Sequence, residues 1–234
     1  MRFLSMVFFI IAAFLPVLSP AQSRLYSLSI SGTYTSSSKI FFNPNASDDF
    51  VRNQNFPLDN IFGVRADVRR YIEDWSVWIG LSTEWLSKSD VIDQPVSNTT
   101  TVPVNDGYIA IPVELTGYFV VPFSSEMVQL YIGGGGGVYF GERLYQEAGV
   151  NAGVVDRSAG LGIHVLSGLQ FNIEPALAIR CEAKFRNVQF KSKNAFTAPV
   201  AFYNGASIPL DQTPFESRIS IDGMVTALSL VYRL

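Results

Sequence analysis

The one histidine of this chain, His164, is the residue type that most often serves as a general acid or base near neutral pH. In enzymes that act on lipid esters, such a histidine works beside a serine or a carboxylate. No nucleophile stands next to His164 in the sequence, although folding alone can bring one close. We therefore expect a histidine held in a structural polar network, and no catalytic residue.

Five consecutive glycines, residues 133–137, could form a backbone cradle for phosphate. Phosphate-binding loops of that kind continue into a Lys-Ser or Lys-Thr pair and a helix, and neither follows here. Glycine inside a strand more often permits a bend or the close packing of neighbours. No cluster with metal-ligand spacing is visible either, and we expect neither a cofactor nor a metal.

Charged residues recur at every second position of several segments, with apolar residues between them. Five are basic and four are acidic: Arg65, Asp67, Arg69, Glu84, Glu114, Arg180, Glu182, Lys184 and Arg186. In a strand, alternate residues point to the same face, so each segment presents its charges on one side. Because the two signs nearly cancel, we expect a buried, salt-bridged network.

The segments that carry these charges read as strands from end to end. Alternation with a period near two indicates a sheet with one apolar face. We expect eight strands, at 24–35, 61–71, 75–85, 108–121, 127–140, 160–173, 177–188 and one that ends at Leu234. The last strand loses its phase around Asp222 and Gly223, which indicates a bulge there.

The connections alternate strictly between short and long. Short ones lie at 72–74, 122–126 and 174–176, and long ones lie at 36–60, 86–107, 141–159 and 189–217. Short periplasmic turns opposite long external loops are typical of outer-membrane barrels. The sequence therefore predicts an all-β, eight-stranded, antiparallel, up-and-down transmembrane β-barrel with both mature termini in the periplasm. A soluble lipocalin-like barrel, with its apolar face inward, is the alternative fold.

Composition agrees with export and membrane insertion. The chain is 48% hydrophobic and 16% charged, against roughly 25% charged residues in an average soluble domain. Residues 1–23 combine Arg2, an apolar stretch and small residues, as in a signal peptide cleaved near 21–23, although an uncleaved anchor is the alternative. Residues 24–234 then form the barrel domain. The single cysteine excludes an intrachain disulfide, and the net charge of −3 gives no reason to expect nucleic acid.

Aromatic residues gather at two kinds of place. Those near the expected strand ends suit the interfacial girdles of a membrane barrel: Tyr26, Tyr34, Trp75, Trp85, Phe140 and Tyr232. Others lie in the first and last long loops: Phe41, Phe42, Phe50, Phe56, Phe196, Phe202, Tyr203 and Phe215. The loop aromatics either pack the loops together or form a surface patch for an apolar ligand or a protein.

Three segments carry a family resemblance. Residues 111–119 (IPVELTGYF) resemble the IPLLLKYYF strand of outer-membrane β-barrel domains common in Bacteroidetes, and residues 130–135 (LYIGGG) resemble the next strand. Residues 228–234 are similar to the family's terminal strand, which barrel-assembly machinery recognises, although Leu234 replaces the usual Phe. The resemblance implies a small OmpA/OmpX-like porin-family barrel in the outer membrane of a diderm bacterium. It implies no catalytic residues.

Three functions are open at this point. We expect first a structural or interaction barrel, monomeric and lipid-embedded, with a salt-bridged plugged lumen and an extracellular ligand or protein bound through its loops. The second is a narrow channel or transporter for small or hydrophobic solutes, which needs a gap in the plug. The third is a lipid-modifying barrel enzyme, for which His164 is the candidate base.

Overall fold

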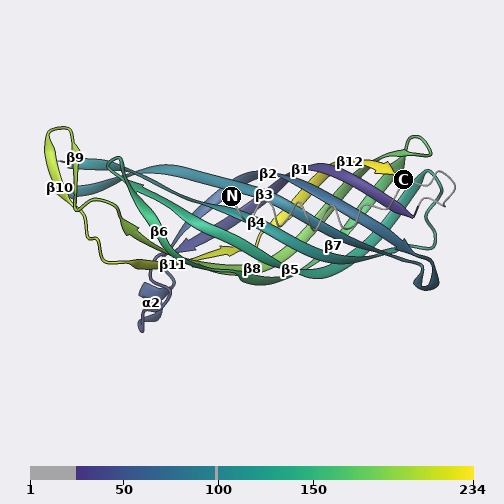
Figure 1. The fold of residues 1–234 in the computed structure, drawn as a ribbon, viewed down its shortest axis with the longest axis horizontal. Helices are drawn as coiled ribbons and strands as arrows, with labels where there is room; N and C mark the ends of the chain where they lie inside the picture. The colour runs from purple at the N-terminus through teal and green to yellow at the C-terminus, as the bar shows by residue number, and fades with distance from the viewer. Residues whose placement is uncertain (1–24, 98–99) are drawn as a thin grey trace.

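The computed structural model describes residues 25–97 and 100–234 as an elongated, tilted barrel (Figure 1). The predicted signal peptide lies outside these residues. The wall consists of β1 (Tyr26–Phe41), β2 (Asn55–Ile72), β3 (Val77–Ser97), β4 (Thr100–Val120), β5 (Val128–Glu147), β6 (Val150–Ser158), β7 (Gly160–Asn172), β8 (Leu177–Phe196), β11 (Phe215–Ile221) and β12 (Met224–Arg233). Three small elements lie in the connections between its strands: helix α2 (Asp49–Arg52), the 3-10 turn Glu73–Trp75, and the hairpin of β9 (Val200–Tyr203) and β10 (Ala206–Pro209).

The ring has eight positions, all antiparallel, as the sequence predicts. Neighbouring positions of the ring are paired, and β1 closes the ring by pairing with both β2 and β12. Strands β6 and β7 share one position, and β11 and β12 share another. The predicted bulge is confirmed, because the pairing with β1 moves from Thr35↔Val225 to Lys39↔Ser220 across Asp222 and Gly223, a shift of one residue.

Side chains alternate between the two faces of the wall. Along β7, Leu161, Ile163 and Val165 point outward with 80%, 73% and 62% of their surface exposed. The alternate residues Gly162, His164 and Leu166 are buried. The apolar set therefore faces outward and the charged set inward. The lipocalin-like alternative, which needs the reverse arrangement, is wrong. None of the helices within the described part of the chain is long and apolar enough to cross a bilayer.

Several strands are longer than the sequence predicts. Strand β3 continues to Ser97 and β4 begins at Thr100, so the expected loop at 86–107 is mostly a two-stranded extension of the wall. Strand β8 likewise continues to Phe196. At the other end, the predicted strand start at Trp75 is wrong, since this residue lies in the 3-10 turn and β3 begins at Val77.

The glycine run lets two strands approach closely. A Cβ atom built on Gly135 would lie 2.0 Å from the backbone oxygen of Leu115 in the neighbouring strand β4. No residue other than glycine fits that distance. The run is a packing feature of β5, which leaves the space inside the barrel to larger side chains of other strands.

The wall is interrupted where β5 passes from β7 to β6. Strand β5 pairs with β7 up to Tyr139 and with β6 from Tyr145, but residues 141–144 have no register partner on either strand. Side chains of β8 replace the missing ladder: Ser192 Oγ accepts from the Arg143 amide at 3.1 Å, and Asn194 Nδ2 donates to the Arg143 carbonyl at 3.1 Å. Strand β6 meanwhile pairs with β8, with a register shift between Val154 and Asp156.

Candidate functional site

The inward positions of β8 show how the barrel interior is organised. From the end with the tight turns upward, they are Ala178, Arg180, Glu182, Lys184, Arg186, Val188, Phe190, Ser192 and Asn194, all buried. After Ala178 come four charged residues, then two apolar ones, then two polar ones. Side chains from the other strands join each level, so the lumen is filled in layers.

The lowest layer is an ionic cluster that uses five of the nine predicted charges. Glu182 accepts hydrogen bonds from Arg65, from Arg69 at 2.6 Å and from the Tyr131 hydroxyl at 2.7 Å. Asp67 accepts from Arg69 at 2.7 Å, from Arg180 at 3.2 Å and from the Ser29 hydroxyl. The Arg69 guanidinium also lies over the Tyr118 ring, 3.8 Å from its centre.

The other four predicted charges form two ion pairs just above. Arg186 donates to Glu84 at 2.7 Å, and Lys184 donates to Glu114 at 2.6 Å. The structure thus places all nine residues inside the barrel, each at most 6% exposed. Buried charges are tolerated when they are paired and hydrogen-bonded, which is the case here.

His164 belongs to this second layer. Its Nε2 lies 2.8 Å from the Thr116 hydroxyl, and its Nδ1 lies 3.8 Å from a Glu114 oxygen. A hydroxyl, an imidazole and a carboxylate in this order resemble a nucleophile triad. Glu114 is already engaged by Lys184 and by the Tyr139 hydroxyl, however, and the His164 side chain has no exposed surface. Thr116 is also buried, so the whole group lies within the packed interior of the barrel.

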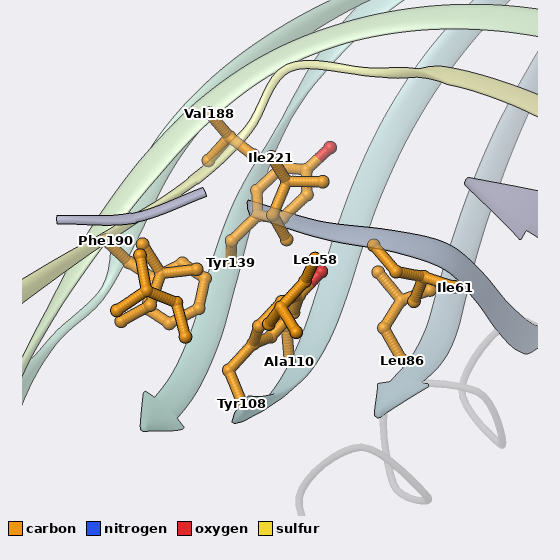
Figure 2. Close-up of a cluster of buried hydrophobic side chains, with 11 residues drawn as sticks. Leu58, Ile61, Leu86, Tyr108, Ala110, Tyr139, Val188, Phe190 and Ile221 are labelled. Atoms are coloured by element: carbon orange, nitrogen blue, oxygen red, sulfur yellow. The ribbon is translucent and has the colours of Figure 1, made fainter. Parts of the chain in front are cut away.

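An apolar layer covers the ionic ones. Figure 2 shows its side chains turned toward one another from several strands of the wall. The layer consists of Ile40, Leu58, Ile61, Leu86, Tyr108, Ala110, Tyr139, Val188, Phe190, Ile219 and Ile221. All of them are at most 1% exposed. These buried side chains pack against one another across the barrel at this level.

Above the apolar layer lies an ion pair that sequence reasoning missed. Arg143 donates to both carboxylate oxygens of Asp106, at 2.8 and 2.5 Å, and to the Ser217 hydroxyl at 2.6 Å. Both residues are buried. The sequence places both residues at the ends of expected loops because Asn105, Gly107 and Glu142 beside them are not apolar, which weakens the alternation that marks a membrane-spanning strand.

The aromatic residues of the two long loops have divided roles. Phe196 and Phe215 pack on Tyr145, with ring centres 5.9 and 5.6 Å away, and Phe56 packs against the apolar layer. Phe50 on α2 and Phe202 on β9 are instead 77% and 79% exposed. Packing therefore explains part of the predicted patch, and two separate exposed rings remain.

The predicted girdle aromatics lie at the two ends of the outward apolar belt. Trp85 and Phe140 lie at its upper edge, where the next outward residues on their strands are Ser87 and Glu142. Tyr26 and Tyr232 lie at the lower edge. Above the belt, Lys191 donates to Glu216 at 2.7 Å, and this hydrogen bond lowers the pKa of the Glu216 carboxyl.

Comparison with known proteins agrees with this architecture. No family model and no curated protein matches the sequence, so the Bacteroidetes-type resemblance has no independent support. Among solved structures, the outer membrane protein OprG from Pseudomonas aeruginosa aligns with a TM-score of 0.53 and 11% identity, over 90% of this chain and 96% of that one. The chain has the outer-membrane β-barrel fold.

Two further structures align over similar lengths. The attachment invasion locus protein Ail of Yersinia pestis gives a TM-score of 0.45 and 14% identity, over 89% of this chain and 97% of that one. Neisserial surface protein A gives a TM-score of 0.47 and 10% identity, over 91% of this chain and 98% of that one. At these identities the likeness concerns the fold. Within the described residues, no group of His, Cys, Asp and Glu could hold a metal ion.

Proposed function

We propose that this protein is a closed, non-conducting barrel in the outer membrane of a diderm bacterium, and that it acts through its extracellular end. The observation that carries the proposal is the filled lumen, in which ionic layers and an apolar layer of eleven residues follow one another. A barrel of eight strands is just wide enough for side chains to fill its interior. What remains available to a partner is the outer surface.

The extracellular end offers that surface. The wall extends beyond the apolar belt and is capped by a second apolar cluster, which includes Val102, Val104 and Ile208. Phe202 stays exposed on the β9–β10 hairpin of this cap, and Phe50 stays exposed on α2, apart from it (Figure 1). Exposed aromatic rings on an otherwise polar surface favour contacts with a protein or an apolar ligand. The other partners we propose are outer-membrane lipid and the barrel-assembly machinery, with the barrel itself a monomer.

Planar bilayer recordings test the closed lumen. We expect the purified protein to insert without producing discrete conductance steps, because the apolar layer interrupts any ion path. Conductance steps that change in Asp106→Asn but not in Asp59→Asn would contradict the proposal. Asp106 lies inside the barrel and Asp59 is exposed on β2, so this result would place the current in the lumen and favour a narrow channel.

The orientation is proposed from the unequal ends of the barrel, with the tight turns in the periplasm. A cysteine at Asn204, in the turn between β9 and β10, should react with an impermeant maleimide on intact cells. A cysteine at Asp74 should react only after permeabilisation. Both variants need Cys181→Ala, because Cys181 is itself exposed. The opposite labelling pattern would reverse the orientation.

The enzyme alternative receives no support from the site. Thr116, His164 and Glu114 have the residue types of a hydrolase triad but lie buried inside the wall. We therefore propose no catalytic activity for this chain.

A further inference from the structure

A small cavity of about 120 Å³ lies inside the barrel at the end with the tight turns. Its position follows from its lining: Val120 is the last residue of β4, Gln129 is the second of β5, and Arg233 is the last of β12. Trp78, Val120 and Gln129 are only partly buried, so the cavity can be reached from this end of the barrel. The volume holds several water molecules or one small ion.

The ionic cluster above this cavity contains one more cation than anion. Three guanidinium groups, those of Arg65, Arg69 and Arg180, share the two carboxylates of Asp67 and Glu182. The other buried ion pairs in the described lumen are balanced: Arg186 with Glu84, Lys184 with Glu114, and Arg143 with Asp106. An uncompensated buried charge destabilises a protein, so this excess calls for a counter-ion.

Arg180 is the guanidinium with the weakest compensation. Only its Nη1 reaches a carboxylate, Asp67, at 3.2 Å, while its Nε and Nη2 both donate to the neutral amide oxygen of Gln170, at 3.2 and 3.0 Å. Both Arg180 and Arg69 line the cavity, and the described lining residues include no acidic side chain. A guanidinium held mainly by neutral acceptors can exchange them for the planar, two-oxygen face of a carboxylate or phosphate.

We propose that this cavity binds a small oxyanion, a carboxylate or a phosphate group, which neutralises the excess cation of the ionic cluster. Arg180 and Arg69 supply the charge, and the Gln129 amide supplies a further hydrogen-bond donor. The rings of Trp78 and Tyr131 exclude water from the side of the anion. The site is separate from the extracellular surface and stands whether or not that surface binds a partner.

The test uses inorganic phosphate and the full-length mature protein in phosphatidylcholine nanodiscs. Trp75→Phe and Trp85→Phe leave Trp78, which lines the cavity, as the only tryptophan. At constant ionic strength, we expect phosphate to change the Trp78 fluorescence saturably and to raise the denaturant midpoint of unfolding. Arg180→Gln should weaken the apparent affinity at least tenfold, and so should Gln129→Glu, which places a negative charge at the partly exposed mouth.

Two controls complete the design. Arg70→Gln removes an arginine from the same end of β2 but on the outward face, beside Tyr26, and should leave the affinity unchanged. Gln129→Lys keeps the length of the mutated side chain without adding an acid and should retain binding. If Arg180→Gln fails to fold, Gln129→Glu still decides the outcome, because Gln129 makes no ion pair.

Three results would overturn the proposal: no saturable response, a response that survives Gln129→Glu, or a response lost in Arg70→Gln. Repeating the titration in phosphatidylglycerol nanodiscs distinguishes the two sources of the oxyanion. If these discs alone produce the phosphate-bound spectrum, the anion is a lipid headgroup. If phosphate still titrates the site there, the anion is a free one. Either result supports the same site.

Discussion

Glu182→Gln is expected to lower the free energy of unfolding in lipid vesicles by about 3–5 kcal/mol. Glu182 is the acceptor for Arg65, Arg69 and Tyr131, and the substitution leaves three buried guanidinium groups with the single carboxylate of Asp67. The glutamine has nearly the same shape, so the loss measures charge compensation rather than packing. Urea-induced unfolding, followed by the mobility difference between folded and unfolded protein on unheated gels, gives the value.

The matched control is Glu216→Gln. Glu216 accepts a hydrogen bond from Lys191, but the Glu216 side chain is 31% exposed and the Lys191 side chain is 46% exposed. Ion pairs exposed to solvent usually contribute no more than about 1 kcal/mol to the free energy of unfolding. The double variant Glu182→Arg and Arg65→Glu exchanges the two charges. It should regain part of the stability that Glu182→Arg alone loses. If Glu182→Gln costs no more than Glu216→Gln, the lower cluster does not stabilise the barrel.

Val165→Arg is expected to cost about 2–4 kcal/mol in the same vesicles, by a different mechanism. Val165 points outward near the middle of β7, where the guanidinium would enter the hydrocarbon with no acid to pair with it. Ile179→Arg should cost less, because Ile179 is the third residue of β8 and the arginine can reach the interface.

Asn187→Arg supplies the control for this second experiment. Asn187 is outward and exposed on β8, one outward position beyond Phe185, where the apolar belt ends. The arginine there lies beside Ile163 of β7 but can extend its guanidinium to the water at the edge of the belt, and stability should stay within about 1 kcal/mol of the wild type. A Val165→Arg protein as stable as Asn187→Arg would show that β7 does not face lipid at this depth.

The part of the fold inside the membrane could be predicted because its two faces differ most there. Alternation of Leu161, Ile163 and Val165 with buried residues marks β7, and the same pattern on β8 places Arg180 to Arg186 inside. The sequence could not say which opposite charges meet. That Glu182 pairs with Arg65 and Arg69, 117 and 113 residues away, depends on how the ring closes.

Above the membrane the same rule no longer applies. Val102, Val104 and Leu58 are apolar and buried, whereas Ser87, Lys191 and Lys193 are outward and polar. The polarity of the two faces is therefore inverted relative to the belt, as in a water-soluble sheet. When the apolar residues change from the outward to the inward face midway along a strand, the alternation averages out along the sequence. This is why the sequence predicts loops in place of the extensions of β3, β4 and β8 and does not indicate that Arg143 and Asp106 are buried.

The interruption between β5 and β6 makes the stability of the ring uneven. Along β7, every residue from Gly160 to Phe171 has a register partner on β5, so the two strands separate only if a continuous ladder breaks. At residues 141–144 two side-chain hydrogen bonds, from Ser192 and Asn194, hold the backbone instead. Local opening there costs less than opening anywhere along β7. Thermal fluctuations of the folded barrel should therefore begin at this seam, outside the hydrocarbon, while the salt-bridged half stays closed.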